Sequence, residues 1–196
     1  MKLFALTTAA YLTLANAAPG IIEIPDADYS AKVGSQCAWI SAQSYGQLVT
    51  CQAGWVMTGI CGSGGKADCE NETVFFQIQC CESGGSESQK NCELDASWFG
   101  YDSQCEGNKL AYGGCGSGQF SDCNHTGDDY YNELFCCDND SISYGDGPSI
   151  TDYGTYGQQL YCPPGYAVTE FCGSGRGKDC NGSVTKITCQ PYEILA

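Results

Sequence analysis

Apolar and polar residues alternate along short segments of this chain, and the same alternation returns at three places. Phe76, Ile78 and Cys80 alternate with polar positions, which is the pattern of a half-buried strand. Leu134 and Ile187 each stand two positions before a cysteine in the same way as Ile78. No sustained helical periodicity is present and 26 glycines interrupt the chain, so the pattern predicts an all-β protein of short strands joined by glycine-rich turns.

The chain also repeats itself in sequence. The motif C-G-S-G-x-x-x-D-C occurs three times, at 61–69, 115–123 and 172–180. Alignment on the motif gives three repeats, at 37–81, 92–137 and 150–192. A unit of about 45 residues is too small to hold a core by itself. We therefore expect one domain over 37–196, in which three sheets pack around a shared axis with pseudo-threefold symmetry.

The N-terminus has the features of a secretory signal. Lys2 precedes an apolar run over 3–14, and Ala15-Asn16-Ala17 matches a signal cleavage site. The apolar run is too short to span a bilayer. We expect a signal peptide at 1–17, a leader at 18–36 and a secreted, extracellular product.

Net charge and cysteine content narrow the function classes. The net charge of −15 disfavours binding to nucleic acid or to anionic membranes, and it permits contact with Ca²⁺, basic proteins or mineral surfaces. All 16 cysteines follow the signal peptide, which favours a disulfide framework. Zinc binding would require short ligand spacings that are absent here, and the chain has a single histidine.

The first two repeats each hold six cysteines, whereas the third holds four and lacks the first and the last. Two cysteines lost together indicate bonded partners, which predicts Cys37–Cys81 and Cys92–Cys137. A ring in which Cys81 pairs with Cys92 and Cys37 with Cys137 would explain the same loss. We favour bonds within a repeat, because these propagate when a unit duplicates. The remaining pairs that we favour are Cys51–Cys80, Cys61–Cys69, Cys105–Cys136, Cys115–Cys123, Cys162–Cys189 and Cys172–Cys180.

The third repeat resembles the repeat of the vitelline membrane outer layer protein family. The resemblance is carried by Tyr156-Gly157, by Cys162-Pro163-Pro164-Gly165 and by Ile187-Thr188-Cys189. In that family an aromatic-Gly segment, a Cys-Pro-x-Gly element and an Ile-x-Cys strand likewise occur three times, although its Trp-Gly-x-Trp opening is missing here. The resemblance implies a three-sheet β-prism, with roles in egg-coat structure and sugar handling.

Residues that could carry chemistry are few. His125 is the single imidazole and sits in an expected loop, so we interpret it as a surface histidine and predict no catalytic site and no enzyme activity. Asp68, Asp122 and Asp179 recur before the closing cysteine of each motif, and we interpret them as turn residues rather than ligands. No cofactor and no specific metal site are expected.

Acidic and aromatic residues offer two further kinds of surface. A diffuse run of acidic residues lacks the spacing of a calcium-binding loop, so we interpret it as a solvated surface. Weak binding of Ca²⁺ at many sites stays an alternative. The run comprises Asp128, Asp129, Asp138, Asp140, Asp146 and Asp152. Aromatic residues could stack on sugar rings, although core positions are the commoner role. The candidates are the aromatic-Gly residues Tyr45, Phe99 and Tyr156, and then Trp55, Tyr112, Tyr130, Tyr131 and Tyr166.

Four sequons predict N-glycosylation of the secreted chain, at Asn71, Asn124, Asn139 and Asn181. Three of them follow the closing cysteine of a motif, which would place glycans at one end of the domain and a ligand at the other. The sequence as a whole predicts an acidic, cysteine-rich structural glycoprotein of an extracellular coat or mineralised matrix, with coat or matrix components and glycans as partners. The alternative is a secreted carbohydrate-binding, lectin-like module.

Overall fold

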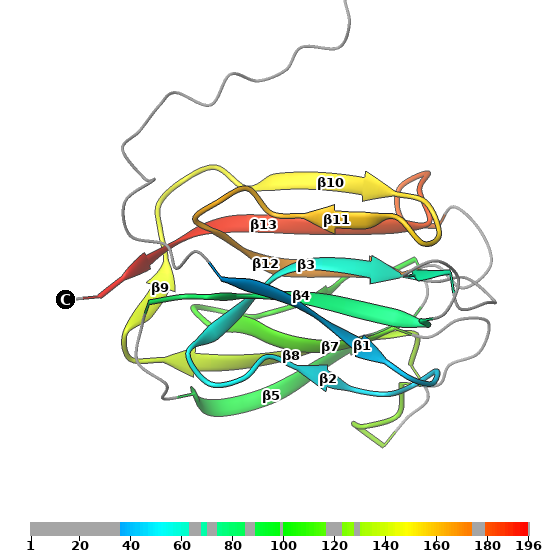
Figure 1. Ribbon diagram of the computed structural model, residues 1–196, viewed down its shortest axis with the longest axis horizontal. Coiled ribbons are helices and arrows are strands. Elements are labelled where there is room, and N and C mark those ends of the chain that lie inside the picture. Colours follow the sequence, from blue (N-terminus) through cyan, green and yellow to red (C-terminus); the bar gives the residue numbers. More distant parts are fainter. Residues whose placement is uncertain are drawn as a thin grey trace, which may run out of the picture.

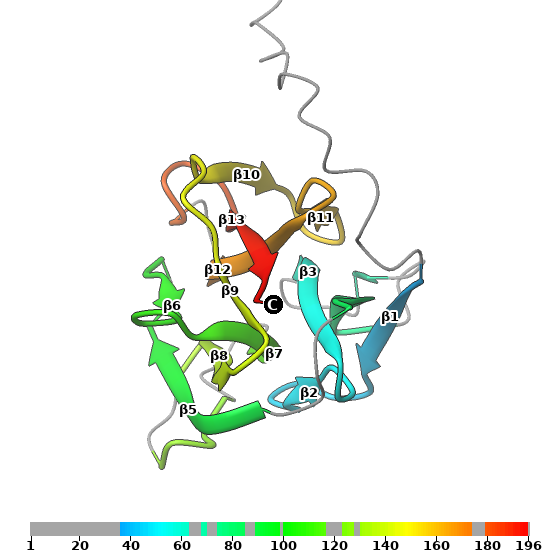
Figure 2. The ribbon, with the colours of Figure 1, turned by 90° about the vertical axis from the view of Figure 1, so that its left-hand side faces the viewer.

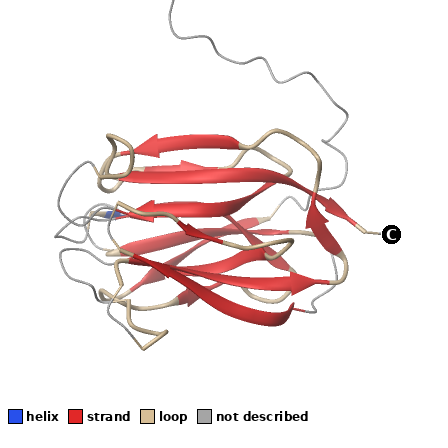
Figure 3. Ribbon diagram, turned by 180° about the vertical axis from the view of Figure 1, so that it is seen from behind, coloured by secondary structure: helices blue, strands red, loops and turns tan. Residues whose placement is uncertain are grey.

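The computed structural model describes residues 36–62, 68–69, 74–84, 89–98, 100–116, 123–127, 130–173 and 179–195. The expected signal peptide, nearly all of the leader and the middle of each C-G-S-G loop lie outside these residues. Within them the chain is all-β (Figures 1 and 3), and no described helix has the length and apolar character needed to cross a bilayer. The strands are β1 (Cys37–Ala42), β2 (Val49–Thr50), β3 (Trp55–Gly62), β4 (Phe76–Glu82), β5 (Gln89–Ser97), β6 (Ser103–Gln104), β7 (Leu110–Gly116), β8 (Asn132–Asn139), β9 (Ile142–Tyr144), β10 (Ile150–Gly154), β11 (Gln159–Tyr161), β12 (Tyr166–Gly173) and β13 (Thr185–Ile194).

The strands form three antiparallel sheets, in the orders β1-β4-β3-β11, β5-β8-β7-β2 and β10-β13-β12-β6. Each sheet takes three strands from one repeat and one short strand from another, and β9 from the linker pairs with β13 as a fifth strand of the third sheet. The first repeat lends β2 to the second, the second lends β6 to the third, and the third lends β11 to the first. Each repeat therefore gives one strand to the next, and the third gives its strand to the first. The sequence did not indicate this cyclic exchange of strands. In Figure 2 the three sheets lie around a common centre.

A β-bulge at an equivalent place in each repeat meets the chain that follows the exchanged strand. The pairing register shifts at Thr58, Tyr112 and Thr169. A bulged residue leaves its carbonyl outside the regular ladder, so this group is available to another strand. These carbonyls accept backbone N–H groups across the repeats, with N···O distances of 2.8 Å for Cys162 to Thr58, 2.6 Å for Cys51 to Tyr112 and 3.0 Å for Cys105 to Thr169.

The core is shared among all three repeats, because the alternating apolar residues of each last strand face inward. Ile78, Leu134 and Ile187 are fully buried in one cluster that includes residues of every repeat. Within it, the rings of Phe76 and Phe171 lie 5.7 Å apart. A sheet that buries one face in this way needs the other two sheets to exclude water from it, as the small size of each repeat requires.

A second buried cluster closes the end of the molecule where the C-terminus emerges. Val56, Leu110 and Ala167 stand at equivalent positions of β3, β7 and β12 and meet there. Ile142, from the linker between the second and third repeats, packs on them, and its strand β9 pairs with the end of β13. Figure 1 shows β9 beside the C-terminal end of β13, so the linker acts as a cover for this end of the core.

The first glycine of each C-G-S-G motif is required by close contact between repeats. A Cβ atom added there would lie within 3.2 Å of a side-chain atom from another repeat, which is tighter than ordinary packing. The contacts are Gly62 with Thr185, Gly116 with Phe76 and Gly173 with Asn132. Recurrence of this glycine therefore follows from the packing of three sheets on one another.

Every cysteine is disulfide-bonded, and all bonds lie within a repeat. The pairs are Cys37–Cys81, Cys51–Cys80, Cys61–Cys69, Cys92–Cys137, Cys105–Cys136, Cys115–Cys123, Cys162–Cys189 and Cys172–Cys180. These are the pairs favoured by the alignment of the repeats, and the structure does not contain the ring alternative. Cys37 lies directly opposite Cys81 on β1 and β4, whereas Cys92–Cys137 spans the place where the β5–β8 register shifts between Lys90 and Glu93; in both bonds the Cα atoms are 4.1 Å apart.

In the third repeat a hydrogen bond stands where the others have their outer disulfide. The register Ile150 opposite Cys189 matches Ala38 opposite Cys80, so Ser149 and Gln190 occupy the places of Cys37 and Cys81. The Gln190 side-chain amide donates to Ser149 Oγ over 3.3 Å. The paired loss of two cysteines thus left two polar side chains that still interact.

Candidate functional site

The outer faces of the three sheets carry different chemistry at one equivalent position. Gln77, Glu133 and Lys186 each stand opposite the first cysteine of a C-G-S-G motif. Gln77 donates to Ser41 Oγ over 3.0 Å, whereas the Lys186 ammonium lies 2.6 Å from an Asp102 carboxylate oxygen. The three copies have therefore kept a common frame but have diverged in the side chain at this position.

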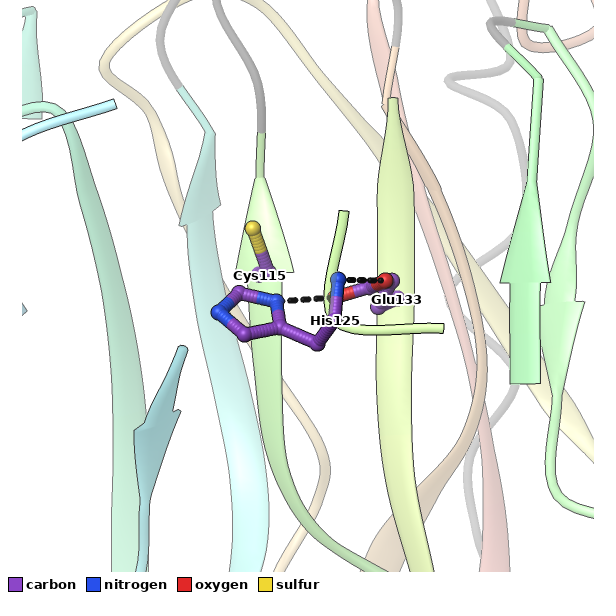
Figure 4. A group of neighbouring side chains, drawn as sticks. All are labelled: Cys115, His125 and Glu133. Atoms are coloured by element: carbon purple, nitrogen blue, oxygen red, sulfur yellow. Dashed lines mark hydrogen bonds and ion pairs between the residues drawn. The ribbon is translucent and has the colours of Figure 1, made fainter. Parts of the chain in front are cut away.

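Glu133 forms an ion pair with His125, the single histidine of the sequence. The Glu133 side chain is fully buried, its Oε2 lies 2.5 Å from His125 Nδ1, and its Oε1 accepts the backbone N–H of His125 over 3.0 Å (Figure 4). The interpretation of His125 as a surface residue without a role is therefore incomplete. Its ring is partly exposed, but it supplies the partner that a buried carboxylate needs.

This pair does not make a metal centre or a nucleophilic site. Cys115 Sγ lies close to both side chains, but it is bonded to Cys123 and so cannot act as a thiolate ligand (Figure 4). Two ligands are fewer than a structural zinc ion takes from a protein. Among the described residues no cysteine is free, and no serine or threonine hydroxyl is hydrogen-bonded to the His125 ring. Among the described residues, the contacts of the pair are those of a buried carboxylate with its hydrogen-bond donors.

The recurring aspartates lie where one repeat contacts another. A Cβ added to Gly157 would lie 2.4 Å from the carbonyl oxygen of Asp68, and one added to Gly100 would lie 2.7 Å from Asp179 Cβ. Both glycines have positive φ, at 72° and 80°. The aromatic-Gly turns of the third and second repeats thus contact the aspartates of the next repeat, which supports a turn role for these aspartates. Asp122 lies outside the described residues.

The aromatic candidates differ in their exposure. Tyr112 is buried, Tyr45 packs against Phe75 with ring centroids 4.2 Å apart, and Trp55 and Tyr166 pack on the core. Tyr130 and Tyr131 are half-buried, Tyr156 is exposed, and Phe99 lies outside the described residues.

The most exposed aromatic side chains are ones that sequence reasoning did not single out as ligand sites. Trp98 is 54% exposed and Tyr101 is 70% exposed. A signal was available, because these residues flank the aromatic-Gly pair of the second repeat, where the third repeat has Thr155 and Gln158.

The acidic run does not converge. Asp138 accepts a hydrogen bond from Asn91, Asp140 pairs with Lys90, and Asp152 accepts the N–H of its neighbour. The only group of metal-ligating side chains found among the described residues is the one around Glu133. Asp128 and Asp129 lie outside the described residues. The described part of the run is a set of separate surface contacts.

The sequons lie in different environments. Asn124 and Asn181 are exposed in turns, whereas Asn71 lies outside the described residues. Asn139 is half-buried on β8, where its amide nitrogen donates to the Tyr112 hydroxyl over 2.9 Å and its Oδ1 accepts the N–H of Ser141. A glycan on Asn139 would leave this half-buried nitrogen a single hydrogen, so attachment would disturb its contact with Tyr112.

Burial changes the acidity of the tyrosines in the second cluster. Burial raises the pKa of Tyr192 to about 12, and it raises the pKa values of Tyr144 and Tyr112 as well. The Tyr144 hydroxyl donates to the Val168 carbonyl, whereas the buried Tyr192 hydroxyl has no hydrogen-bond partner among the described residues.

Comparison with known proteins adds no homologue to this picture. No family model, curated protein or solved structure matches the chain.

Proposed function

We propose that this chain is a secreted, acidic structural protein of an extracellular coat or mineralised matrix. Two observations carry the proposal. Every cysteine is paired in one of eight disulfides within a repeat, and each repeat gives one short strand to the sheet of another repeat. Disulfides at this density are typical of secreted proteins. Each one restricts the unfolded chain, and together they oppose both unfolding and proteolysis. A domain stabilised in this way suits a protein that must persist outside the cell.

The finer architecture is part of the proposal. Three repeats with matching bulges, matching disulfides and matching cross-repeat hydrogen bonds support a β-prism with pseudo-threefold symmetry. We also propose a relationship to the vitelline membrane outer layer protein family, which is supported by the sequence motifs of the third repeat. The positive φ angles of Gly46, Gly100 and Gly157 give the aromatic-Gly segments of that resemblance one turn conformation in all three repeats.

The partners follow from charge and surface chemistry. A net charge of −15 favours calcium-bearing mineral or basic matrix components and disfavours nucleic acid and anionic membranes. The isolated surface carboxylates suit weak, many-site Ca²⁺ contact. We also propose that the protein is not an enzyme, because the described residues bring no nucleophile to the His125–Glu133 pair.

The test is to express the full chain in secretory cells and to precipitate calcium carbonate and calcium phosphate in its presence. A coat or matrix protein should remain in the mineral after washing and be released when the mineral is dissolved with a chelator. A reduced and alkylated sample controls for charge alone, since it keeps the acidic residues but loses the fold. Equal retention of both samples, or retention of neither, would contradict the proposal.

The second candidate function is a carbohydrate-binding module. It is favoured by the exposed aromatic side chains of the second repeat, Trp98 and Tyr101, which do not contribute to the core.

A further inference from the structure

We propose that Trp98 and Tyr101, with Tyr130 beside Trp98, bind a neutral glycan; this inference rests on the second candidate function. The Trp98 and Tyr130 ring centroids lie 5.6 Å apart, and the planes are tilted. Trp98 and Tyr101 are joined by a turn hydrogen bond, in which the Tyr101 N–H donates to the Trp98 carbonyl over 3.1 Å. Trp98 thus lies beside Tyr130, and Tyr101 is joined to Trp98 through the backbone. Tyr130 pairs with Cys123 and Gly100 contacts Asp179, so the site lies at the end of the domain that carries the Asn124 and Asn181 sequons, and the expectation of a ligand at the opposite end does not apply to it.

The other repeats form the same turn with polar residues at the two positions that flank the aromatic-Gly pair. In the third repeat the N–H of Gln158 donates to the Thr155 carbonyl over 3.1 Å, so the backbone geometry matches that of Trp98 and Tyr101. In the first repeat the corresponding residues are Ser44 and Gln47. All three turns contain an aromatic-Gly pair, but the two positions that flank the pair do not need aromatic residues for the turn to form. Aromatic residues at both flanking positions in the second repeat alone therefore indicate a use other than folding.

A buried polar network under the turn is a second and independent feature of the same repeat. Ser97 Oγ lies 3.0 Å from the Tyr101 carbonyl oxygen, and the Asn132 amide donates to that oxygen over 3.2 Å. Ser103 Oγ lies 3.0 Å from Ser97 Oγ and donates to the Asn132 carbonyl. All three polar side chains are buried, so their hydrogen bonds fix the position of Tyr101.

This network is absent from the equivalent places of the other repeats. The opposed pair Ser97 and Asn132 corresponds to Ala42 and Phe76 in the first repeat. In the third repeat it corresponds to Gly154 and Thr185. The aromatic turn and its polar support therefore occur together and only in the second repeat, as expected of a site that one copy has acquired.

The chemistry of the patch suits a sugar. Exposed aromatic faces carry negative electrostatic potential and attract the C–H groups on the apolar face of a pyranose ring. Asp102 follows Tyr101 directly, and the Lys186 ammonium at 2.6 Å balances its charge while its carboxylate keeps further acceptor sites for hydroxyl groups. The overall net charge of −15 disfavours sulfated or carboxylated glycans, so the glycan is neutral.

The size of the patch argues against a protein partner. A stable protein interface buries about 800 Å² on each side, whereas three aromatic side chains supply roughly half of this at most. A short segment of a glycan chain needs only a few rings to stack on. The proposed occupant is therefore two or three sugar units of a neutral polysaccharide.

The experiment uses the secreted full chain and four neutral hexasaccharides, derived from chitin, cellulose, laminarin and mannan. Binding is measured by calorimetry and by protection of tryptophan fluorescence from acrylamide, because Trp98 is the most exposed of the three tryptophans. The test variant, Trp98→Ser with Tyr101→Gln, installs the residues of the first repeat. The control variant, Tyr161→Ser, removes an exposed aromatic of the first sheet that is 46% exposed.

At least one hexasaccharide should bind to the wild type and protect its fluorescence. The test variant should bind roughly tenfold or more weakly, and the control should stay within about twofold. Unchanged disulfides and circular dichroism would show that the test variant folds. Glycan binding that survives in this variant would overturn the site but keep the carbohydrate-binding function. No binding to any neutral glycan, or binding to heparin alone, would overturn both and leave the coat function standing. A dimer that the test variant converts to monomer would assign the patch to a second copy instead.

Discussion

Restoring the disulfide that the third repeat lacks would test the equivalence of the three repeats directly. The variant carries Ser149→Cys and Gln190→Cys, at the places of Cys37 and Cys81. Ser149 stands directly before β10, in register with Gln190 of β13, and the two side chains are already hydrogen-bonded, so we expect a ninth disulfide to form there. We expect the secreted variant to contain no free thiol, and a digest without reduction should yield a peptide that joins 149 to 190.

The expected gain in stability follows from the loop that the new bond closes. Cys162–Cys189 already connects the two segments, so the shortest covalent path runs from 149 to 162 and from 189 to 190. A loop of about 15 residues corresponds to about 3 kcal/mol of chain entropy, and loss of one exposed hydrogen bond subtracts roughly 1 kcal/mol. The free energy of unfolding should therefore rise by about 2 kcal/mol.

The assay is guanidinium unfolding under non-reducing conditions, with Ser149→Ala plus Gln190→Ala as the control that removes the hydrogen bond alone. The control should lie within about 1 kcal/mol of the wild type. Two titratable thiols in a folded variant would refute the assigned register. A ninth bond that forms but lowers the midpoint would show that the opening of the third repeat differs in geometry from the other two.

Three further substitutions and one mapping of glycans probe other parts of the molecule. Gly157→Ala should destabilise the fold by roughly 3 kcal/mol in guanidinium unfolding, because φ is positive there and the new Cβ would meet a backbone oxygen at 2.4 Å; a neutral result would refute the contact. His125→Ala should lower stability by roughly 3 kcal/mol, since it leaves a buried carboxylate with one backbone donor. The native pKa of Tyr192 is about 12, above about 10 in the unfolded chain, so stability should fall as pH rises through this window, and Tyr192→Phe should reduce the fall by about 1 kcal/mol at pH 11. Mass spectrometry of glycopeptides should find sugar on Asn124 and none on Asn139; an occupied Asn139 would contradict its buried hydrogen bond.

Much of the covalent framework could be predicted from the sequence, because a duplicated unit repeats its bonds. The loss of two cysteines from one copy indicated their partners in the others. The aromatic-Gly pairs were visible for the same reason, although their contact with Asp68 and Asp179 was not.

The closed exchange of strands could not be predicted in this way. β2 and β6 have two residues each, which is too short for any periodic pattern, and their partners belong to another repeat. The linker between the second and third repeats likewise gave no sign that it would form β9 and cover the core. Because β9 and β10 are both paired with β13, the residues between them, 145–149, are the part of this linker where we expect the fastest hydrogen exchange.

The proposed glycan site at Trp98 and Tyr101 could not be predicted from the sequence for a different reason. Aromatic residues in a repeat are usually part of the core, and exposure cannot be read from alternation in a turn. The contrast with Ser44 and Gln47 was available in the alignment, but its meaning depended on the network beneath Tyr101.

The most direct test of the account is the mapping of disulfides in the protein collected from the medium of secreting cells. Digestion without reduction, followed by mass spectrometry, should yield eight linkages, each confined to one repeat, and no free cysteine. Cys37–Cys81 and Cys92–Cys137 are the decisive pairs, because they exclude the ring. Peptides that join Cys37 to Cys137 or Cys81 to Cys92, or a substantial content of free thiol, would contradict a domain in which every disulfide lies within one repeat.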